Sequence, residues 1–182
     1  MSSVSLTAQI AALEQGLNNL QKRVETFPVT EILISRLLIS LGREISNHLD
    51  HRLRPFGLGE AEFKVLMSIY GAADNAINPG DLCVGMSQSP ANITRLTDSL
   101  VERGLISRIP DEHDRRKLLL QLTPQGVTLI KKLMPVTVEG AQKIYRDFSR
   151  TELKKILSDL KKLAALVDRE IESGVNRKSG ND

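Results

Sequence analysis

The sequence has few of the residues that support a disulfide-rich, membrane-spanning or aromatic-cored protein. Of 182 residues, one is cysteine, none is tryptophan and 3% are aromatic. The single cysteine, Cys83, excludes an internal disulfide and fits a reducing, cytoplasmic compartment. No apolar run approaches the roughly 18 residues of a transmembrane helix, and residues 1–15 lack the basic and apolar regions of a signal peptide. We therefore expect a cytoplasmic protein without membrane contact.

Composition points to a packed, mostly α-helical fold. Hydrophobic residues make up 41% of the chain, and with so few aromatics the core must consist of Leu, Ile and Val. The net charge of +3 is only slightly basic, and residues 60–123 carry nine acidic against seven basic side chains, a net −2. Bulk charge therefore does not argue for a nucleic-acid partner, and any such case depends on where the cations lie.

Long helices are predicted on both sides of the chain's middle. Residues 5–24 carry apolar side chains at alternating steps of four and three, which indicates an amphipathic helix that needs a partner. The next helix, from Thr30 as its N-cap to Arg54, is apolar on more than one face and must be buried on two sides. Further helices are expected at 59–73, at 124–147, where Pro135 should produce a kink, and at 150–172, which a Ser149–Glu152 capping box begins.

The middle of the chain is divided by N-cap residues that directly precede prolines. Asn78-Pro79, Ser89-Pro90 and Thr123-Pro124 each predict a helix start. The first two helices, 79–85 and 90–103, are short and joined by a tight turn, as in a helix-turn-helix, and Gly104 ends the second. Strands at 105–109 and 117–122 then enclose a polar loop, so the pattern predicts a winged helix.

The expected fold class is mostly α with a small β-hairpin wing, a winged helix-turn-helix flanked by long dimerisation helices. Those outer helices expose more apolar surface than the winged helix can cover, and a second copy of the chain is the simplest way to bury it. The expected segments are an N-terminal extension at 1–29, a dimerisation helix at 30–58, a DNA-binding domain at 59–123, C-terminal dimerisation helices at 124–172 and a disordered tail at 173–182.

The helix predicted at 90–103 has a face suited to the major groove of DNA. Ile93, Leu96 and Leu100 fall on one side, while the acidic Asp98 and Glu102 restrict close approach to the N-terminal half of the opposite side. The candidate phosphate contacts are Ser87, Gln88 and Ser89, and the candidate base contacts are Asn92, Thr94 and Arg95. The alternative is a polar face that meets only water.

The loop IPDEHDRRK, residues 109–117, places three cations side by side at the tip of the predicted hairpin. Like charges in a short loop are costly unless an anion is near, and the DNA minor groove accepts arginine. We expect Arg115, Arg116 and Lys117 to contact DNA, with Asp114 orienting Arg115 through a charge-assisted hydrogen bond. The alternative is a solvated turn with a local ion pair.

The segment SLVERGLISRIPDEHDRRKLLLQLTPQG, residues 99–126, resembles the winged-helix core of the MarR family of bacterial regulators. The resemblance runs from about residue 31 to 170 and, with FPVTEILISRL at 27–37, is strongest toward the EmrR branch, which represses multidrug efflux-pump genes. It implies an obligate homodimer, palindromic DNA and release by small aromatic or phenolic compounds. By position in the family's wing motif, Arg116 is the expected minor-groove residue, with Asp114 and Arg115 supporting it.

An effector pocket between the long helices and the DNA-binding domain is also implied by the resemblance. Thr94 and Arg108 match positions at which some family members hold salicylate-like ligands, and Arg108 can pair with a carboxylate or phenolate. The other candidate lining residues are Leu38, Leu41, Ile45, Met67, Tyr70 and Met134. Each of these is also a candidate for plain core packing.

No catalytic motif is present, so we expect a non-enzyme without cofactor or metal. His48 and His51 lie three apart on one helix, but no further ligand completes a metal site. Cys83 is expected to be a packed thiol, and a redox-sensing repressor acting through Cys83 is one alternative function. Another is a winged-helix scaffold for protein interactions that does not bind DNA.

Overall fold

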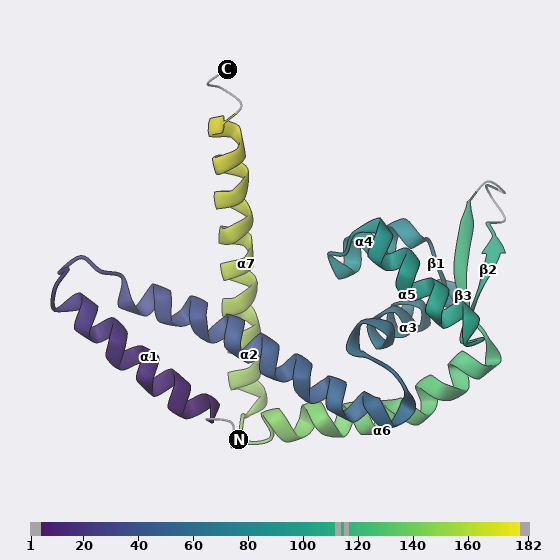
Figure 1. Cartoon of the computed structure of the whole chain (residues 1–182), viewed down its shortest axis with the longest axis horizontal. Helices are drawn as coiled ribbons and strands as arrows, with labels where there is room; N and C mark the ends of the chain where they lie inside the picture. Colours follow the sequence, from purple (N-terminus) through teal and green to yellow (C-terminus); the bar gives the residue numbers. More distant parts are fainter. Residues whose placement is uncertain (1–4, 112–113, 115–116, 179–182) are drawn as a thin grey trace. The chain divides into compact units, whose positions relative to one another are not determined.

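The computed structural model describes residues 5–111, 114 and 117–178, with the backbone alone given for 174–178 (Figure 1). The helices are α1 (Leu6–Gln21), α2 (Val29–Leu53), α3 (Glu60–Gly71), α4 (Pro79–Met86), α5 (Pro90–Glu102), α6 (Pro124–Tyr145) and α7 (Arg150–Lys178). The strands are β1 (Ala76–Ile77), β2 (Ile106–Pro110) and β3 (Leu118–Leu122). This mostly helical chain with a small sheet confirms the predicted fold class.

Within the described residues, no helix has the length and apolar character needed to cross a membrane. The chain divides at residues 137 and 138 into two compact units.

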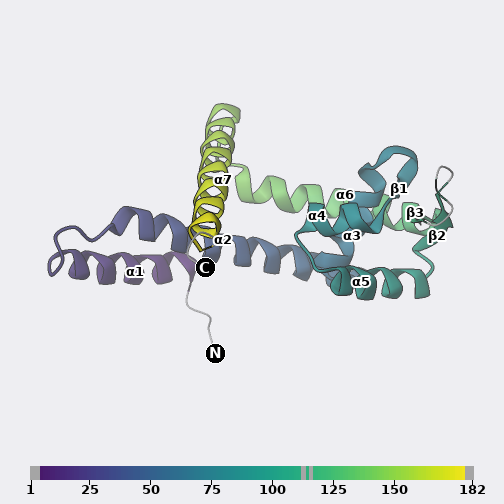
Figure 2. The same ribbon diagram turned by 90° about the horizontal axis from the view of Figure 1, so that it is seen from above.

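The first unit begins with α1, which packs along the first part of α2 (Figures 1 and 2). The first part of the predicted apolar seam is confirmed, because Leu17 is buried and Leu13 lines a groove together with Leu37 of α2. Its last two members are not, because Leu20 and Val24 are exposed and α1 ends at Gln21 instead of residue 24. The predicted N-cap of the second helix is wrong. Ile32 N–H donates to the carbonyl of Pro28 at 3.1 Å, which makes Pro28 the N-cap and leaves Thr30 inside the first turn.

The sheet of the winged helix has three antiparallel strands in the order β1-β3-β2. The hairpin register pairs Ile106 with Leu122 and Pro110 with Leu118. The side chains of Leu120 and Leu122 are buried, as their alternation in the sequence predicts, while Leu118, the member of that set nearest the tip, is exposed. The strand β1 was not predicted, because a strand of two residues is too short for an alternating pattern.

One hydrophobic core holds the winged-helix lobe together, and it extends past the predicted boundaries at residues 59 and 123. Leu53 and Leu58, before the first boundary, are buried with Ile130 and Leu133, beyond the second. The other core residues are Val65, Leu66, Ile69, Leu82, Ile93, Leu96, Leu100, Leu105, Ile106, Leu120 and Leu122. The final turn of α2 and the first half of α6 are therefore parts of the lobe rather than separate supports.

The start of α6 is held close to the start of the wing. The Thr123 hydroxyl donates to the carbonyl of Gly104 at 2.7 Å and accepts from the N–H of Gly126 at 3.1 Å. A Cβ on Gly126 would overlap the carbonyl oxygen of Leu105 and would lie 3.1 Å from Cδ2 of Leu122. Glycine is therefore required where this helix crosses the chain that follows α5.

The second unit contains the end of α6 and all of α7. The predicted capping box is confirmed, since the N–H and hydroxyl of Ser149 contact Oε2 of Glu152 at 2.8 and 2.7 Å. The predicted end at residue 172 is wrong, because α7 continues to Lys178. Residues 173–178 contain one glycine and no proline, and one glycine costs a helix only about 1 kcal/mol. The rest of the predicted tail, 179–182, lies outside the described residues.

Candidate DNA-binding surface

The two helices of the helix-turn-helix are capped as the sequence predicts. The Asn78 side chain accepts from Gly80 N–H at 2.7 Å at the start of α4, and Ser89 Oγ accepts from Asn92 N–H at 3.3 Å at the start of α5. Ser87 ends α4 in the left-handed region, with φ 51° and ψ 45°, and Gln88 N–H then donates to the carbonyl of Cys83 at 3.0 Å. The turn between the helices is thus only three residues long and is fixed by its own hydrogen bonds.

The buried side of α5 anchors this helix in the lobe. Ile93, Leu96 and Leu100 are 1%, 3% and 0% exposed, which confirms the predicted core face. Thr97 is also buried, and its hydroxyl donates to the carbonyl of Thr94 at 3.0 Å. This burial was not predicted from the sequence, because threonine has a polar hydroxyl group. The hydroxyl can be buried here because it forms a hydrogen bond within its own helix.

The exposed side chains at the start of α5 form a chain of hydrogen bonds. Asn92 Nδ2 donates to Gln88 Oε1 at 2.7 Å, and Arg95 Nη2 donates to Asn92 Oδ1 at 3.0 Å. The structure therefore brings three of the predicted DNA-contacting residues into one ordered row, with Ser87, Ser89 and Thr94 exposed beside them. Side chains already held by neighbours lose less freedom when they bind, so this row is suited to recognition.

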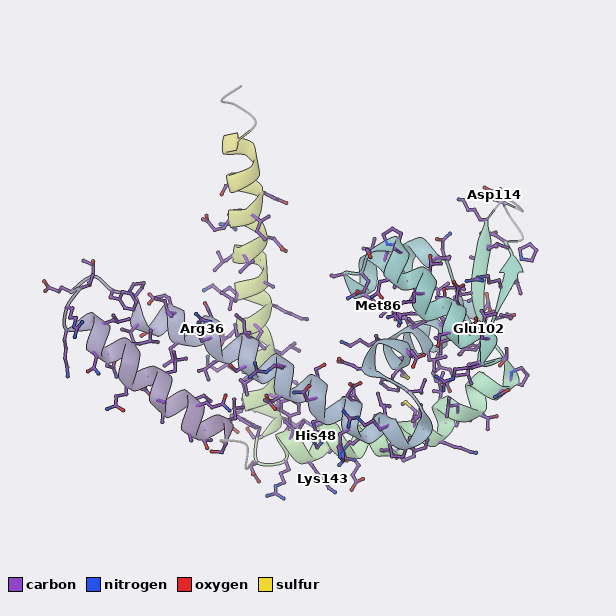
Figure 3. All side chains as sticks on the ribbon, in the orientation of Figure 1. Arg36, His48, Met86, Glu102, Asp114 and Lys143 are labelled. Atoms are coloured by element: carbon purple, nitrogen blue, oxygen red, sulfur yellow. The ribbon has the colours of Figure 1, made fainter. Side chains whose placement is uncertain are left out.

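The hairpin loop is only partly described. Asp111 N–H donates to the carbonyl of Lys117 at 3.0 Å, and Lys117 N–H donates to that of Asp114 at 2.8 Å, which closes the loop at its base. Asp114 lies at the tip of the hairpin, with the Lys117 ammonium 4.0 Å from its carboxylate (Figure 3). Arg116, the predicted minor-groove residue, and Arg115, which was predicted to support it, lie outside the described residues.

The acidic half of α5 is partly neutralised by the wing. Arg108, on β2, donates to the Asp98 carboxylate and to the Thr97 hydroxyl, the latter at 3.4 Å. This ion pair joins the recognition helix to the sheet and removes one of the two negative charges that would repel phosphate. It was not predicted, because the partners are ten residues apart and meet only after the chain reverses into β2.

Thr94 and Arg108 line one cavity of about 290 Å³ beneath the start of α5. Its other lining residues are Pro79, Gly80, Cys83, Pro90, Ile93, Thr97, Leu118 and Leu120. None of the other six candidate pocket residues lines it. Leu38, Leu41 and Ile45 are exposed on α2, whereas Met67, Tyr70 and Met134 pack against the core. Among the lining residues that were not predicted, Cys83 and Pro79 lie one helical turn apart on α4, which places them on the same face of that helix.

Comparison with known proteins places the chain in a family. A family model described as the MarR family matches residues 56–117. The transcriptional repressor MprA of Escherichia coli K12 is 28% identical over 93% of this chain and 97% of its own length. The multiple antibiotic resistance protein MarR of Salmonella typhimurium is 32% identical over 56% of this chain and 69% of its own length.

Two solved structures have the same fold. A cysteine-to-serine mutant of MarR from Escherichia coli, complexed with operator DNA, superposes with a TM-score of 0.66 at 29% identity, over 74% of this chain and 95% of its own. CouR from Rhodococcus jostii, bound to p-coumaroyl-CoA, superposes with a TM-score of 0.67 at 26% identity, over 72% of this chain and 91% of its own. With the capped helix-turn-helix and the hairpin beside it, these likenesses show that the chain belongs to the MarR family of transcriptional regulators.

Proposed function

We propose that this protein is a homodimeric transcriptional repressor that binds a pseudo-palindromic operator. The observation that carries the proposal is the ordered row of Gln88, Asn92 and Arg95 at the exposed start of α5. A recognition helix that enters the major groove by its N-terminus presents such side chains to base edges, and arginine pairs bidentately with guanine. The relation to MprA and to the operator-bound MarR supports this reading.

A second copy of the chain is needed to cover apolar side chains that one copy leaves exposed. On α2 these are Ile34, Leu38, Ile39, Leu41 and Ile45, and on α7 they include Ile156, Leu157, Leu160, Val167 and Ile171. Contiguous apolar faces of this kind are rare on monomers and are normally covered by a symmetric copy. A dimer would present two α5 helices to half-sites one DNA turn, about 34–36 Å, apart.

A small aromatic or phenolic effector would act through the cavity beneath α5. Ile93, Thr94 and Thr97 of the recognition helix line that cavity, so a ligand there contacts the DNA-reading element directly. Its carboxylate or phenolate would compete with Asp98 for Arg108. CouR, which was solved with a small-molecule ligand, supports an effector-controlled function. A ligand that prefers the lobes in a spacing unsuited to DNA shifts the population away from the binding form.

On this proposal the repressor acts in the cytoplasm. The genes that it regulates encode a multidrug efflux pump, as the resemblance to the EmrR branch implies. Support comes from the relation to MprA across 93% of the chain. The proposal predicts that transcription of a neighbouring efflux operon rises when the gene for this chain is deleted.

The direct test is capture of sheared genomic DNA by the purified full-length protein, followed by sequencing and fluorescence anisotropy on the enriched fragment. Arg95→Ala should weaken binding to that fragment by about 1–3 kcal/mol, while binding to unrelated duplex changes little. Lys131→Ala, which removes an exposed cation from α6, is the matched control and should bind as the parent does. Recovery of no preferred fragment would refute the proposal.

The wing and the dimer are tested separately. Arg116→Ala should weaken binding to all duplexes and lower the salt dependence of affinity, because a contact to the minor groove and its phosphates is lost. Unchanged affinity would favour the protein-interaction scaffold instead. Sedimentation at micromolar concentration should give twice the mass of one chain, and Ile39→Glu, on the exposed apolar face of α2, should shift the protein toward monomer.

A further inference from the structure

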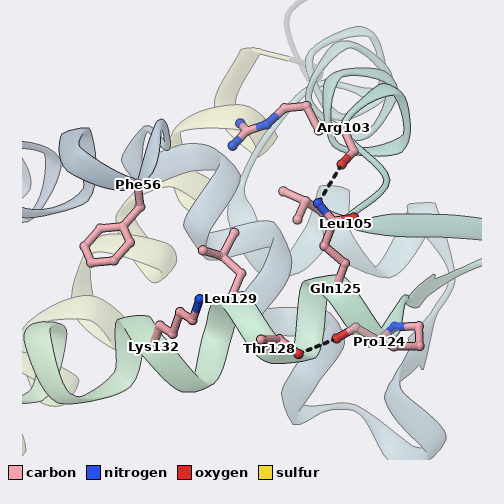
Figure 4. A pocket seen from close by; sticks show the side chains of 8 residues that line it. All are labelled: Phe56, Arg103, Leu105, Pro124, Gln125, Thr128, Leu129 and Lys132. Carbon is pink, nitrogen blue, oxygen red and sulfur yellow. Dashed lines mark hydrogen bonds between the residues drawn. The ribbon is translucent and has the colours of Figure 1, made fainter.

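A second, larger pocket lies on another side of the winged-helix lobe and shares no residue with the cavity of Thr94 and Arg108. Its volume is about 530 Å³, within the usual range for small-molecule sites. It is lined by Phe56, Arg103, Leu105, Pro124, Gln125, Thr128, Leu129 and Lys132 (Figure 4). These residues come from the segment after α2, from the end of α5 and from the first half of α6, so the pocket lies within one unit of the chain.

The charged residues of this lining are both cations. Arg103 and Lys132 come from different elements, and no carboxylate is among the lining residues. Figure 4 shows the Arg103 side chain extending from the end of α5 and the Lys132 side chain extending from α6. A low-dielectric wall beside two cations favours a ligand that carries a negative charge.

Arg103 has a partner, but the contact is long. Its Nη1 lies 3.4 Å from each oxygen of the Glu62 carboxylate, beyond the 2.7–2.9 Å typical of a charge-assisted hydrogen bond. The same carboxylate accepts from Ser99 Oγ at 2.8 Å and from Gly59 N–H at 3.2 Å. Because the Glu62 oxygens also accept these shorter hydrogen bonds, an anion that draws Arg103 away leaves the carboxylate hydrogen-bonded to Ser99 and Gly59.

The rest of the lining suits a flat apolar group. Phe56, Leu105 and Leu129 offer apolar surface, and the Phe56 ring provides a face for offset stacking. The Thr128 hydroxyl donates to the carbonyl of Pro124 at 2.8 Å, so its oxygen remains an acceptor toward the pocket. Apolar surface with a few convergent polar groups is the usual composition of a ligand site.

We propose that this pocket binds a small aromatic carboxylate, with the carboxylate drawn to Arg103 and Lys132 and the ring against Phe56. The site is additional to the effector cavity of the proposed function, and it stands whether or not the protein binds DNA. A bound carboxylate would compete with Glu62 for Arg103, which connects occupancy of the pocket to the end of the recognition helix.

The experiment is isothermal titration calorimetry of the full-length protein with 2-naphthoate, and with 2-naphthylmethanol as the uncharged analogue of similar shape. Arg103→Gln should weaken naphthoate binding at least about 10-fold, and Lys132→Gln about 2- to 5-fold. Lys131→Gln removes a neighbouring exposed cation outside the pocket and should leave affinity unchanged. Arg108→Gln removes the cation of the other cavity, so the naphthoate binding that this variant retains belongs to the pocket of Arg103 and Lys132. Glu62→Gln keeps a hydrogen-bond acceptor but removes the competing charge, and should tighten binding by up to about 5-fold.

The proposal is overturned by any of four results: no naphthoate binding at millimolar concentration, equal affinity for the uncharged analogue, parent-like affinity in Lys132→Gln, or loss of all binding in Arg108→Gln. The last result would place the ligand in the cavity beneath α5 instead. Circular dichroism and a thermal melt of each variant show whether Arg103→Gln is folded, and the surface substitution Lys132→Gln carries the test if it is not.

Discussion

Replacing Gly126 by alanine tests whether the crossing of α6 over the start of the wing requires a glycine. In an unobstructed helix this change stabilises by about 1 kcal/mol, because alanine has the higher helix propensity. At Gly126 the added methyl group overlaps the carbonyl of Leu105 and approaches Leu122 to 3.1 Å. A backbone carbonyl cannot rotate away as a side chain can, so α6 or β2 must shift, and such overpacking costs about 1–3 kcal/mol.

We expect a net loss of up to about 2 kcal/mol, which for a chain of this length corresponds to a fall in Tm of up to about 4–8 °C. The assay is urea unfolding followed by circular dichroism, with a thermal melt at one fixed protein concentration because dimerisation would raise Tm. Gly71→Ala is the matched control. Gly71 ends α3 in the same lobe and has nothing within 4 Å of its added Cβ, so that variant should be as stable as the parent or slightly more. If Gly126→Ala behaves like Gly71→Ala, the close approach does not constrain the fold and the reasoning fails.

Three further predictions concern the lobe and its attachment to α2. Leu100→Ala empties a fully buried site and should lower the free energy of unfolding by about 2–5 kcal/mol, whereas a loss below 1 kcal/mol in urea would mean the core refills. Burial of Glu60 raises its pKa, but hydrogen bonds from Lys64 and Ser46 and the charge of Lys64 outweigh this, so the pKa is lowered. The ionised Glu60 carboxylate therefore stabilises the fold above its ordinary pKa of 4.5, and this contribution is lost as the pH falls through the lowered pKa of the folded state. In Glu60→Gln, the free energy of unfolding should therefore decrease less on acidification than it does in the parent. Ser89→Ala removes the cap of α5, should cost about 1 kcal/mol and should speed hydrogen exchange in the first turn of that helix; unchanged exchange would contradict the capping role.

Local sequence features were sufficient where the stabilising contacts are also local. The cap residues Asn78 and Ser89, each before a proline, placed the starts of α4 and α5 correctly, because N-cap hydrogen bonds span only two or three residues. Gly104 ends α5 in the left-handed region, with φ 65°, as a residue without a Cβ allows. The exposed row at the start of α5 was also foreseeable, since Asn92 and Arg95 lie three residues apart on α5 and Gln88 lies four residues before Asn92, in the turn that leads into the helix.

Contacts between distant elements could not be read from the sequence. The pairing of Arg108 with Asp98 depends on the direction in which the chain reverses after α5, and the second pocket depends on three elements meeting. For the proposed effector cavity, Thr94 and Arg108 came from the family resemblance, whereas the apolar candidates on α2 came from hydrophobicity, which does not distinguish the wall of a ligand pocket from a surface that a partner covers. Periodicity identifies an apolar face but not what covers it.

The recognition helix is fastened at both ends as well as along its buried side. Ser89 holds its first turn, while Ser99 and Arg103 connect its last turn to Glu62 on α3. We therefore expect α5 to move together with the rest of the lobe and to keep its own conformation. An effector that releases the repressor should therefore lower the affinity for every half-site variant by a similar factor, so that the order of preference among variants is the same with and without effector.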